Sequence, residues 1–169
     1  MKQFVLLFAS ACVMLHLPNA LPQADDVTYF RQDYGIASGS DALPQDFGTD
    51  ANRVWRVPMT SGISSPCVHE KYVFLTTFDK ESSELATVAL DSETGNTLWK
   101  RIAPTTRIEA VHPIGNPASC TPACDGERVY SFFGSFGLLC YGLDGSPIWS
   151  RKFGPFQDEF GASSSPILV

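Results

Sequence analysis

The cysteines of this sequence could form disulfides, and cysteine together with histidine could bind a zinc ion. Four cysteines follow residue 24: Cys67, Cys120, Cys124 and Cys140. A structural zinc ion needs four ligands, commonly in two closely spaced pairs. Cys120 and Cys124 flank Pro122, and neither His69 nor His112 completes a second pair. The spacing disfavours zinc and leaves two alternatives open, a disulfide among the four cysteines or free thiols in the core.

A serine run at residues 163–165 could supply a nucleophile. It lacks the Gly-x-Ser-x-Gly frame of a nucleophile elbow, and no matched histidine and aspartate accompany it. We interpret the run as structural. With no other catalytic constellation in the sequence, we expect a chain that is not an enzyme and that holds no cofactor or metal.

Composition and charge restrict the class of protein further. The chain is rich in turn-forming residues, with 13 glycines and 12 prolines, and 12% of its residues are aromatic. This composition is typical of a turn-rich β-protein. The net charge of −6 argues against a nucleic-acid partner, because such binders carry a basic stripe.

The N-terminus predicts export. Lys2 precedes an almost wholly apolar run at residues 4–17, which suits a signal peptide and is short for a membrane span of about 20 residues. A loose lipoprotein box ends at Cys12, but the apolar run continues past it, which disfavours lipidation. We expect a signal peptide at 1–24, a periplasmic or secreted protein with no membrane span after its removal, and an irregular extension at 25–51.

Two patterns repeat along residues 52–169. Trp55, Trp99 and Trp149 are spaced 44 and 50 residues apart, and each is followed within two residues by a basic residue, in "VWRV", "LWKR" and "IWSR". Upstream of them, proline opens "SPCVHEKYVFL", "TPACDGERVYSF" and "SPILV". Each complete unit therefore contains a proline-led strand, a turn, two strands joined by a hairpin, a second turn and a tryptophan strand. Four short strands per unit at this period predict propeller blades.

The local chemistry supports this interpretation. Short runs such as "YVFL", "LATVAL" and "FGLLCYGL" are nearly continuous in apolar residues, which predicts strands covered on both faces. Residues 69–71 and 125–127 form corresponding predicted turns, and Gly134-Ser135 predicts a hairpin. Gly95 and Asp144-Gly145 suit turns that need a left-handed backbone.

One stretch matches a known repeat. Ala89, Asp91, Thr94, Gly95 and Trp99 stand at the positions of the tryptophan-docking motif of PQQ-type quinoprotein propellers. The resemblance implies that the tryptophan packs on the turn of a neighbouring blade and that the aspartate and threonine brace such a turn. It also implies an all-β fold: a partial β-propeller of about two four-stranded antiparallel blades plus flanking strands of incomplete blades near Trp55 and at residues 164–169.

A second, degenerate copy retains Asp144 and Trp149, with Tyr141 in the alanine position. Residues 52–169 also resemble the non-enzymatic PQQ-like repeat proteins of bacterial envelopes, a secreted subgroup similar to the propeller lipoprotein of outer-membrane assembly. This resemblance implies a binding or scaffold module with a protein partner or further propeller blades. The adjacent-cysteine disulfide of quinoprotein dehydrogenases is absent, because the sequence contains no Cys-Cys pair.

Complete propellers of this family have about seven or eight blades. Two blades would leave apolar faces and strand edges exposed, so we expect either assembly with other chains or a truncated gene product without independent function. A fragment of a quinoprotein dehydrogenase is a third alternative, although two blades cannot build the central site of such an enzyme.

Overall fold

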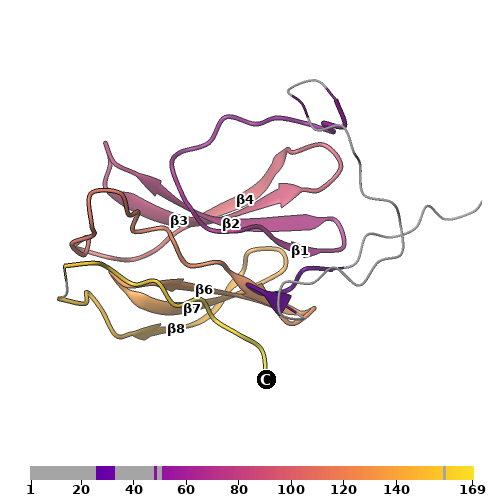
Figure 1. The fold of residues 1–169 in the computed structure, drawn as a ribbon. Coiled ribbons are helices and arrows are strands. Elements are labelled where there is room, and N and C mark those ends of the chain that lie inside the picture. The colour runs from indigo at the N-terminus through magenta and orange to yellow at the C-terminus, as the bar shows by residue number, and fades with distance from the viewer. Residues whose placement is uncertain (1–25, 33–47, 49–50, 158) are drawn as a thin grey trace, which may run out of the picture.

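A computed structural model describes residues 26–32, 48, 51–157 and 159–169, and this part of the chain contains two antiparallel β-sheets and no α-helix. Figure 1 shows the sheets as two stacked layers, which do not close into a ring. The prediction of an all-β chain with two four-stranded antiparallel blades is confirmed. The predicted signal peptide and most of the predicted extension lie outside the described residues.

Each sheet is a meander in which consecutive strands pair. Blade 1 contains β1 (Cys67–His69), β2 (Tyr72–Asp79), β3 (Glu84–Asp91) and β4 (Thr97–Ile102). Blade 2 contains β5 (Ala123–Cys124), β6 (Arg128–Phe133), β7 (Gly137–Gly142) and β8 (Pro147–Lys152). The two blades thus repeat one order of strands, as the sequence repeat predicts.

Backbones with positive φ occur at the turns of both blades. Glu70 (φ 49°) and Gly126 (φ 94°) stand in the first turn of each blade, and Gly95 (φ 73°) and Gly145 (φ 78°) stand in the last. Glycine adopts this conformation without steric cost, which explains three of the four positions. In the β6–β7 hairpin the positive φ belongs to Gly137 rather than to Gly134 of the predicted turn.

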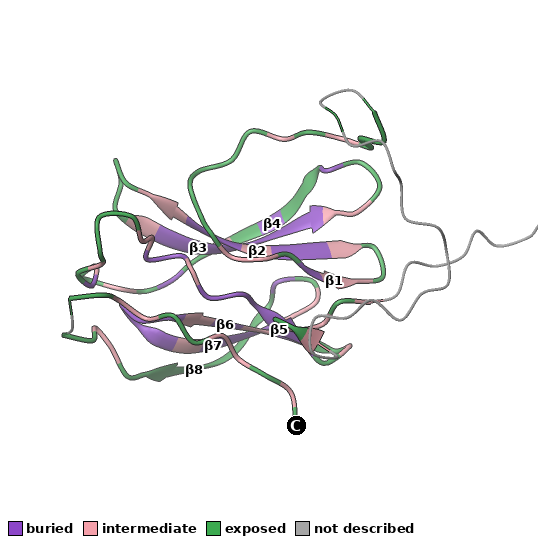
Figure 2. Ribbon diagram, viewed as in Figure 1, coloured by how far each residue is buried: buried purple, intermediate pink, exposed green. Residues whose placement is uncertain are grey.

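The core lies between the blades and on both faces of blade 1. β3 is buried at six successive positions, which agrees with the prediction of strands covered on both faces. One apolar cluster joins Leu85 of blade 1 to Phe133 and Leu139 of blade 2. On the opposite face of blade 1, Trp55 packs against buried Val73 and its neighbours. Figure 2 shows the contrast with β8, which is exposed along its length.

The flanking segments differ from the expectation of partial strands. Residues 53–60 and 164–169 carry no strand assignment, and only an isolated bridge between Ser61 and Phe78 continues the first segment. A strand is defined by a ladder of hydrogen bonds with a neighbour. The first segment instead reaches blade 1 mainly through side chains such as that of Trp55.

The proline-led repeat is visible as a relay of hydrogen bonds from one unit to the next. The Ser65 amide donates to Thr121 Oγ1 (3.0 Å), and the Thr121 amide donates to Ser165 Oγ (2.9 Å). These three residues each precede a proline of the repeat. The relay explains why a hydroxyl residue recurs at this position, and it gives the serine run at 163–165 a structural role.

Replacing Thr121, which is almost fully buried, tests this relay. Thr121→Val keeps the side-chain shape but leaves the Ser65 amide without its acceptor, so we expect the free energy of unfolding to fall by about 1–3 kcal/mol. Thr121→Ser retains the hydroxyl and should cost about 0.8 kcal/mol, the value of one buried methyl group. Urea unfolding measures both, and an equal loss in the two variants would contradict the relay.

Candidate functional site

The contact that joins the two blades is centred on Trp99. Its indole Nε1 donates a 2.8 Å hydrogen bond to the carbonyl of Leu143 in the β7–β8 turn. The indole ring lies against Gly145, where a Cβ atom would approach the ring to 2.7 Å. Arg101 Nε also donates to the Gly145 carbonyl (2.6 Å). Only glycine therefore fits both the backbone conformation and the space beneath the ring.

The same contact occurs one unit earlier in the chain. Trp55 Nε1 donates to the Ser92 carbonyl (2.8 Å), and the Trp55 ring lies against Gly95. The predicted motif is thus divided between two contacts. Asp91, Thr94 and Gly95 belong to the turn that receives Trp55, whereas the tryptophan of that motif docks on the next blade.

Aspartates brace both receiving turns. Asp91 Oδ1 accepts hydrogen bonds from the Thr94 hydroxyl (2.8 Å) and the Thr94 amide (2.9 Å). Asp144 Oδ1 accepts from the Ser146 hydroxyl (2.6 Å) and amide (2.9 Å). The hydroxyl of Thr94 and that of Ser146 are the main causes that hold the pKa of each carboxyl below its ordinary value, because the bonds favour the charged form.

The register of the sheets corrects one detail of the second motif. Ala89 stands opposite Trp99 in blade 1, and Cys140 stands opposite Trp149 in blade 2. A bulge follows each of these pairs at the same place. The structural equivalent of Ala89 is therefore Cys140 and not Tyr141, because the glycine-containing turn of blade 2 is one residue shorter before Trp149.

This register defines two equivalent rows of side chains across the blades. The inner row contains Cys67, Phe74, Ala89 and Trp99. It packs against blade 2 at Cys124 and Val129. The outer row contains Ala123, Tyr130, Cys140 and Trp149. It faces away from blade 1, because successive side chains of a strand alternate between faces and Val129 points inward.

The two rows differ in burial at the tryptophan. Trp99 is 7% exposed, whereas Trp149 is 37% exposed. Each ring contacts the aromatic residue of its own row at a similar distance, Phe74 at 5.9 Å and Tyr130 at 6.0 Å. Among the described residues, no turn receives Trp149 in the way that Leu143 and Gly145 receive Trp99. The outer row thus repeats a buried row, and it is exposed at its Trp149 end, whereas Ala123 and Cys140 are buried.

The four cysteines are free thiols and all are buried. The fold brings Cys67 and Cys124 into one cluster between the blades, but it does not place Cys120 or Cys140 there. Burial raises the pKa of Cys124 to about 11 and raises that of Cys67 further. Both thiols are therefore protonated at neutral pH, a state that is poorly nucleophilic.

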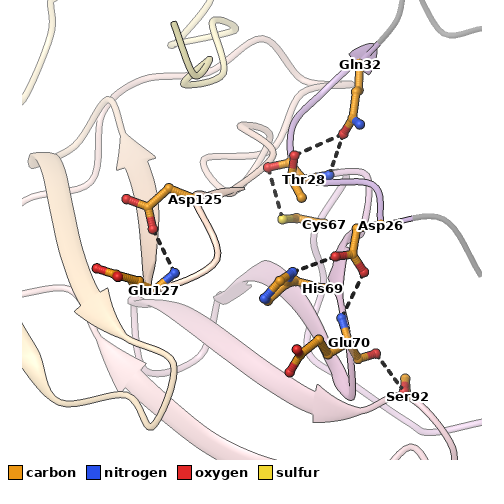
Figure 3. A network of polar contacts seen from close by, with 9 residues as sticks. All are labelled: Asp26, Thr28, Gln32, Cys67, His69, Glu70, Ser92, Asp125 and Glu127. Atoms are coloured by element: carbon orange, nitrogen blue, oxygen red, sulfur yellow. Dashed lines mark hydrogen bonds and ion pairs between the residues drawn. The ribbon is translucent and has the colours of Figure 1, made fainter. Parts of the chain in front are cut away.

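A polar cluster that the sequence analysis missed lies beside these cysteines (Figure 3). Asp26 Oδ2 lies 2.7 Å from His69 Nδ1, and Asp26 Oδ1 accepts a 2.9 Å hydrogen bond from the Glu70 amide. The fold brings Asp26 to blade 1 across more than 40 residues. Its position in an irregular segment carries no periodic signal, so the sequence pattern could not have placed it.

The described residues contain no group of three or more histidine, cysteine, aspartate or glutamate side chains arranged to hold a metal ion. They also include no helix long and apolar enough to cross a membrane. Comparisons with known proteins found no matching family model and no matching curated protein.

The glycine beneath Trp99 can be tested against a matched glycine. Gly145→Ala combines a left-handed alanine, which costs about 1–2 kcal/mol, with a clash against the indole ring that adds about 1–3 kcal/mol. Gly126→Ala places alanine at a similar φ but at ordinary van der Waals distance, 3.8 Å from the nearest atom of His69. Chemical denaturation should show a clearly larger loss for Gly145→Ala, and equal losses would exclude the steric contact with Trp99.

The bracing of the turns predicts a dependence on pH. The folded-state pKa of Asp91 is lowered, so its contribution to stability is complete above the ordinary value of about 3.9 and is lost as the pH falls through the lowered folded value. Asp91→Asn keeps an acceptor oxygen and removes the titration. The unfolding midpoint of this variant should therefore decline less between about pH 4 and pH 2 than that of the parent chain.

Glu93→Gln is the control, since it removes a neighbouring carboxylate of the same turn. An acid profile that changes equally in Asp91→Asn and Glu93→Gln would show that general charge, and not the bracing of the turn, causes the decline.

Proposed function

We propose that the chain is a non-catalytic, PQQ-like β-propeller segment that acts as a binding or scaffold module in the cell envelope. The observation that carries the proposal is Trp149, which is 37% exposed at the end of the outer row, whereas its counterpart Trp99 in the inner row is 7% exposed. Its partner is a further blade or a β-protein that offers a turn of the same chemistry, a free carbonyl beside a left-handed glycine.

The surface around Trp149 has the features of a protein interface. Trp149 presents its ring on the outer face, and its neighbour Ile148, which is 49% exposed, lies on the opposite face of the strand beside a cleft lined by residues of β4, β7 and β8. Tryptophan is enriched at the energetic centres of interfaces because it buries a large area and still offers an N–H donor. An exposed edge strand such as β8 also carries unpaired backbone groups that another strand can satisfy.

The chemistry of the ionisable groups supports a role without catalysis. The thiols of Cys67 and Cys124 are protonated, and the aspartates with lowered pKa values brace turns at the surface. A general acid or base needs a pKa near the working pH, and a thiol nucleophile needs a lowered one. The proposed location in the envelope rests on the signal-like residues 1–24.

Photo-crosslinking tests the outer row. A photoreactive phenylalanine derivative in place of Trp149, in the full chain expressed with its own leader in the native host, should give discrete adducts in the envelope fraction. The control places the same group at Ile114, which is 88% exposed in a loop. Adducts at least several-fold stronger at position 149 support the proposal, and equal labelling at the two positions contradicts it.

Equilibrium dialysis separates this function from that of a quinoprotein fragment. The full chain should retain no PQQ in the presence of Ca²⁺, and its absorption spectrum should match that of the chain with Ca²⁺ alone. Stoichiometric retention of a quinone chromophore would overturn the non-catalytic assignment.

A further inference from the structure

Residues Asp26–Thr28, here called the strap, run across β1 and β5, the first edge strand of each blade. The Val68 amide of β1 donates to the Val27 carbonyl (2.7 Å), and the Cys124 amide of β5 donates to the Thr28 carbonyl (2.8 Å). Val27 and Val68 form an antiparallel bridge. One extended segment thus accepts hydrogen bonds from the first strand of each blade, which is how a peptide adds to the edge of a sheet.

The turn after β1 recognises the first side chain of the strap. The Asp26 carboxylate receives the Glu70 amide at one oxygen and contacts the His69 imidazole at the other (Figure 3). Glu70 has a left-handed backbone (φ 49°) in this turn. The His69 side chain is only 15% exposed, so the pairing is partly shielded from water. Hydrogen bonds to a carboxylate are stronger than those between neutral groups.

The rest of the strap contributes little apolar contact. Val27 is 45% exposed, and Thr28 adds only its carbonyl, which also accepts a bond from Cys67 Sγ (3.3 Å). Recognition therefore depends on the backbone and on one carboxylate. Burial is the main cause that raises the pKa of the Cys124 thiol, and the nearby charges of Asp125, Asp26 and Glu70 raise it further, so the surroundings disfavour a second negative charge.

From this geometry we propose that the edges of β1 and β5 and the His69–Glu70 turn form a binding site for an extended peptide, which the strap occupies within the chain. The ligand is a partner's segment with a single aspartate followed by two extended residues, as in Asp26–Thr28. This inference deepens the proposed binding function and rests on it. The strap and the partner's segment compete for the same backbone donors.

The strap has a large advantage in this competition. The strap belongs to the same chain as the site, so its effective concentration there exceeds that of a free peptide at micromolar concentration, and such a peptide does not displace it. Weakening the strap should therefore open the site to a peptide added in solution. A partner engages the site in the cell only when a second contact, such as the outer row, raises its own local concentration.

The test uses the full chain and a fluorescent peptide with the sequence of residues 24–32. By fluorescence anisotropy, the Asp26→Ala chain should bind this peptide at least about tenfold more tightly than the parent chain does, because its own strap has lost the carboxylate contacts. Asp26→Asn, which keeps the size of the side chain, should behave in the same way. It provides a second opened receptor in case Asp26→Ala does not fold.

Two changes then probe recognition of the carboxylate. The same peptide with asparagine in place of its aspartate should bind the Asp26→Ala chain about tenfold more weakly, and so should the normal peptide with the Asp26→Ala, His69→Gln double variant. Asp79→Ala serves as a matched receptor control, because Asp79 braces a different turn through the amides of Glu81 and Ser82. It should bind the peptide no better than the parent chain.

The results overturn the inference if folded Asp26→Ala and Asp26→Asn chains bind no more peptide than the parent, or if His69→Gln leaves binding unchanged. Specific adducts at position 149 together with no peptide binding would remove this site and leave the proposed function standing. Equal labelling at positions 149 and 114 would remove the proposed function, whereas peptide binding would still be decided by the strap variants.

Discussion

An indole ring that covers a left-handed glycine, and donates its N–H to a carbonyl of the same turn, is the interaction on which the arrangement of this molecule depends. Trp99 connects blade 1 to blade 2 in this way, and Trp55 covers the corresponding turn of blade 1. The contact combines a large apolar area with one directional bond, so it fixes both the distance and the orientation of neighbouring sheets. The inter-blade clusters around Phe74 and Phe133 pack within the geometry that it sets.

Because this contact repeats along the chain, the exposed Trp149 side chain of blade 2 has a buried counterpart in blade 1, Trp99. A repeat unit buries this row against the next unit, and among the described residues no turn covers the tryptophan of the equivalent row in blade 2. Trp149 and Tyr130 form that row in blade 2. The proposed binding function follows from this asymmetry, since the exposed residues are those whose counterparts form an interface within the chain.

The strap binds β1 and β5, at the sheet edges opposite β4 and β8, through a different kind of contact. It contributes backbone acceptors and one carboxylate where the docking tryptophans contribute apolar area. Backbone recognition with a single charged anchor is specific in geometry and moderate in strength. The molecule therefore combines two kinds of contact. The docked tryptophans hold neighbouring blades together, and the strap forms the contact at β1 and β5 that we propose to be exchangeable.

Local signals predicted the fold well, because a blade is built from short-range features. The proline-led strands, Gly95, the Asp144-Gly145 turn and the motif ending at Trp99 each act over a few residues, and together they specified two four-stranded sheets. The equivalence of Cys140 with Ala89 was misjudged by one residue, since a shortened turn shifts the alignment and only the hydrogen-bond ladder reveals the register.

The sequence by itself determined the blades and the residues that dock them, because turns and short apolar strands are encoded in neighbouring positions. Only the tertiary structure decided which turns Trp55 and Trp99 cover, that Cys67 and Cys124 meet between the blades, and that Asp26 pairs with His69. These are contacts between residues far apart in the chain, and they form only after the sheets have stacked. No local pattern specifies such partners, since their geometry is a property of the assembled layers.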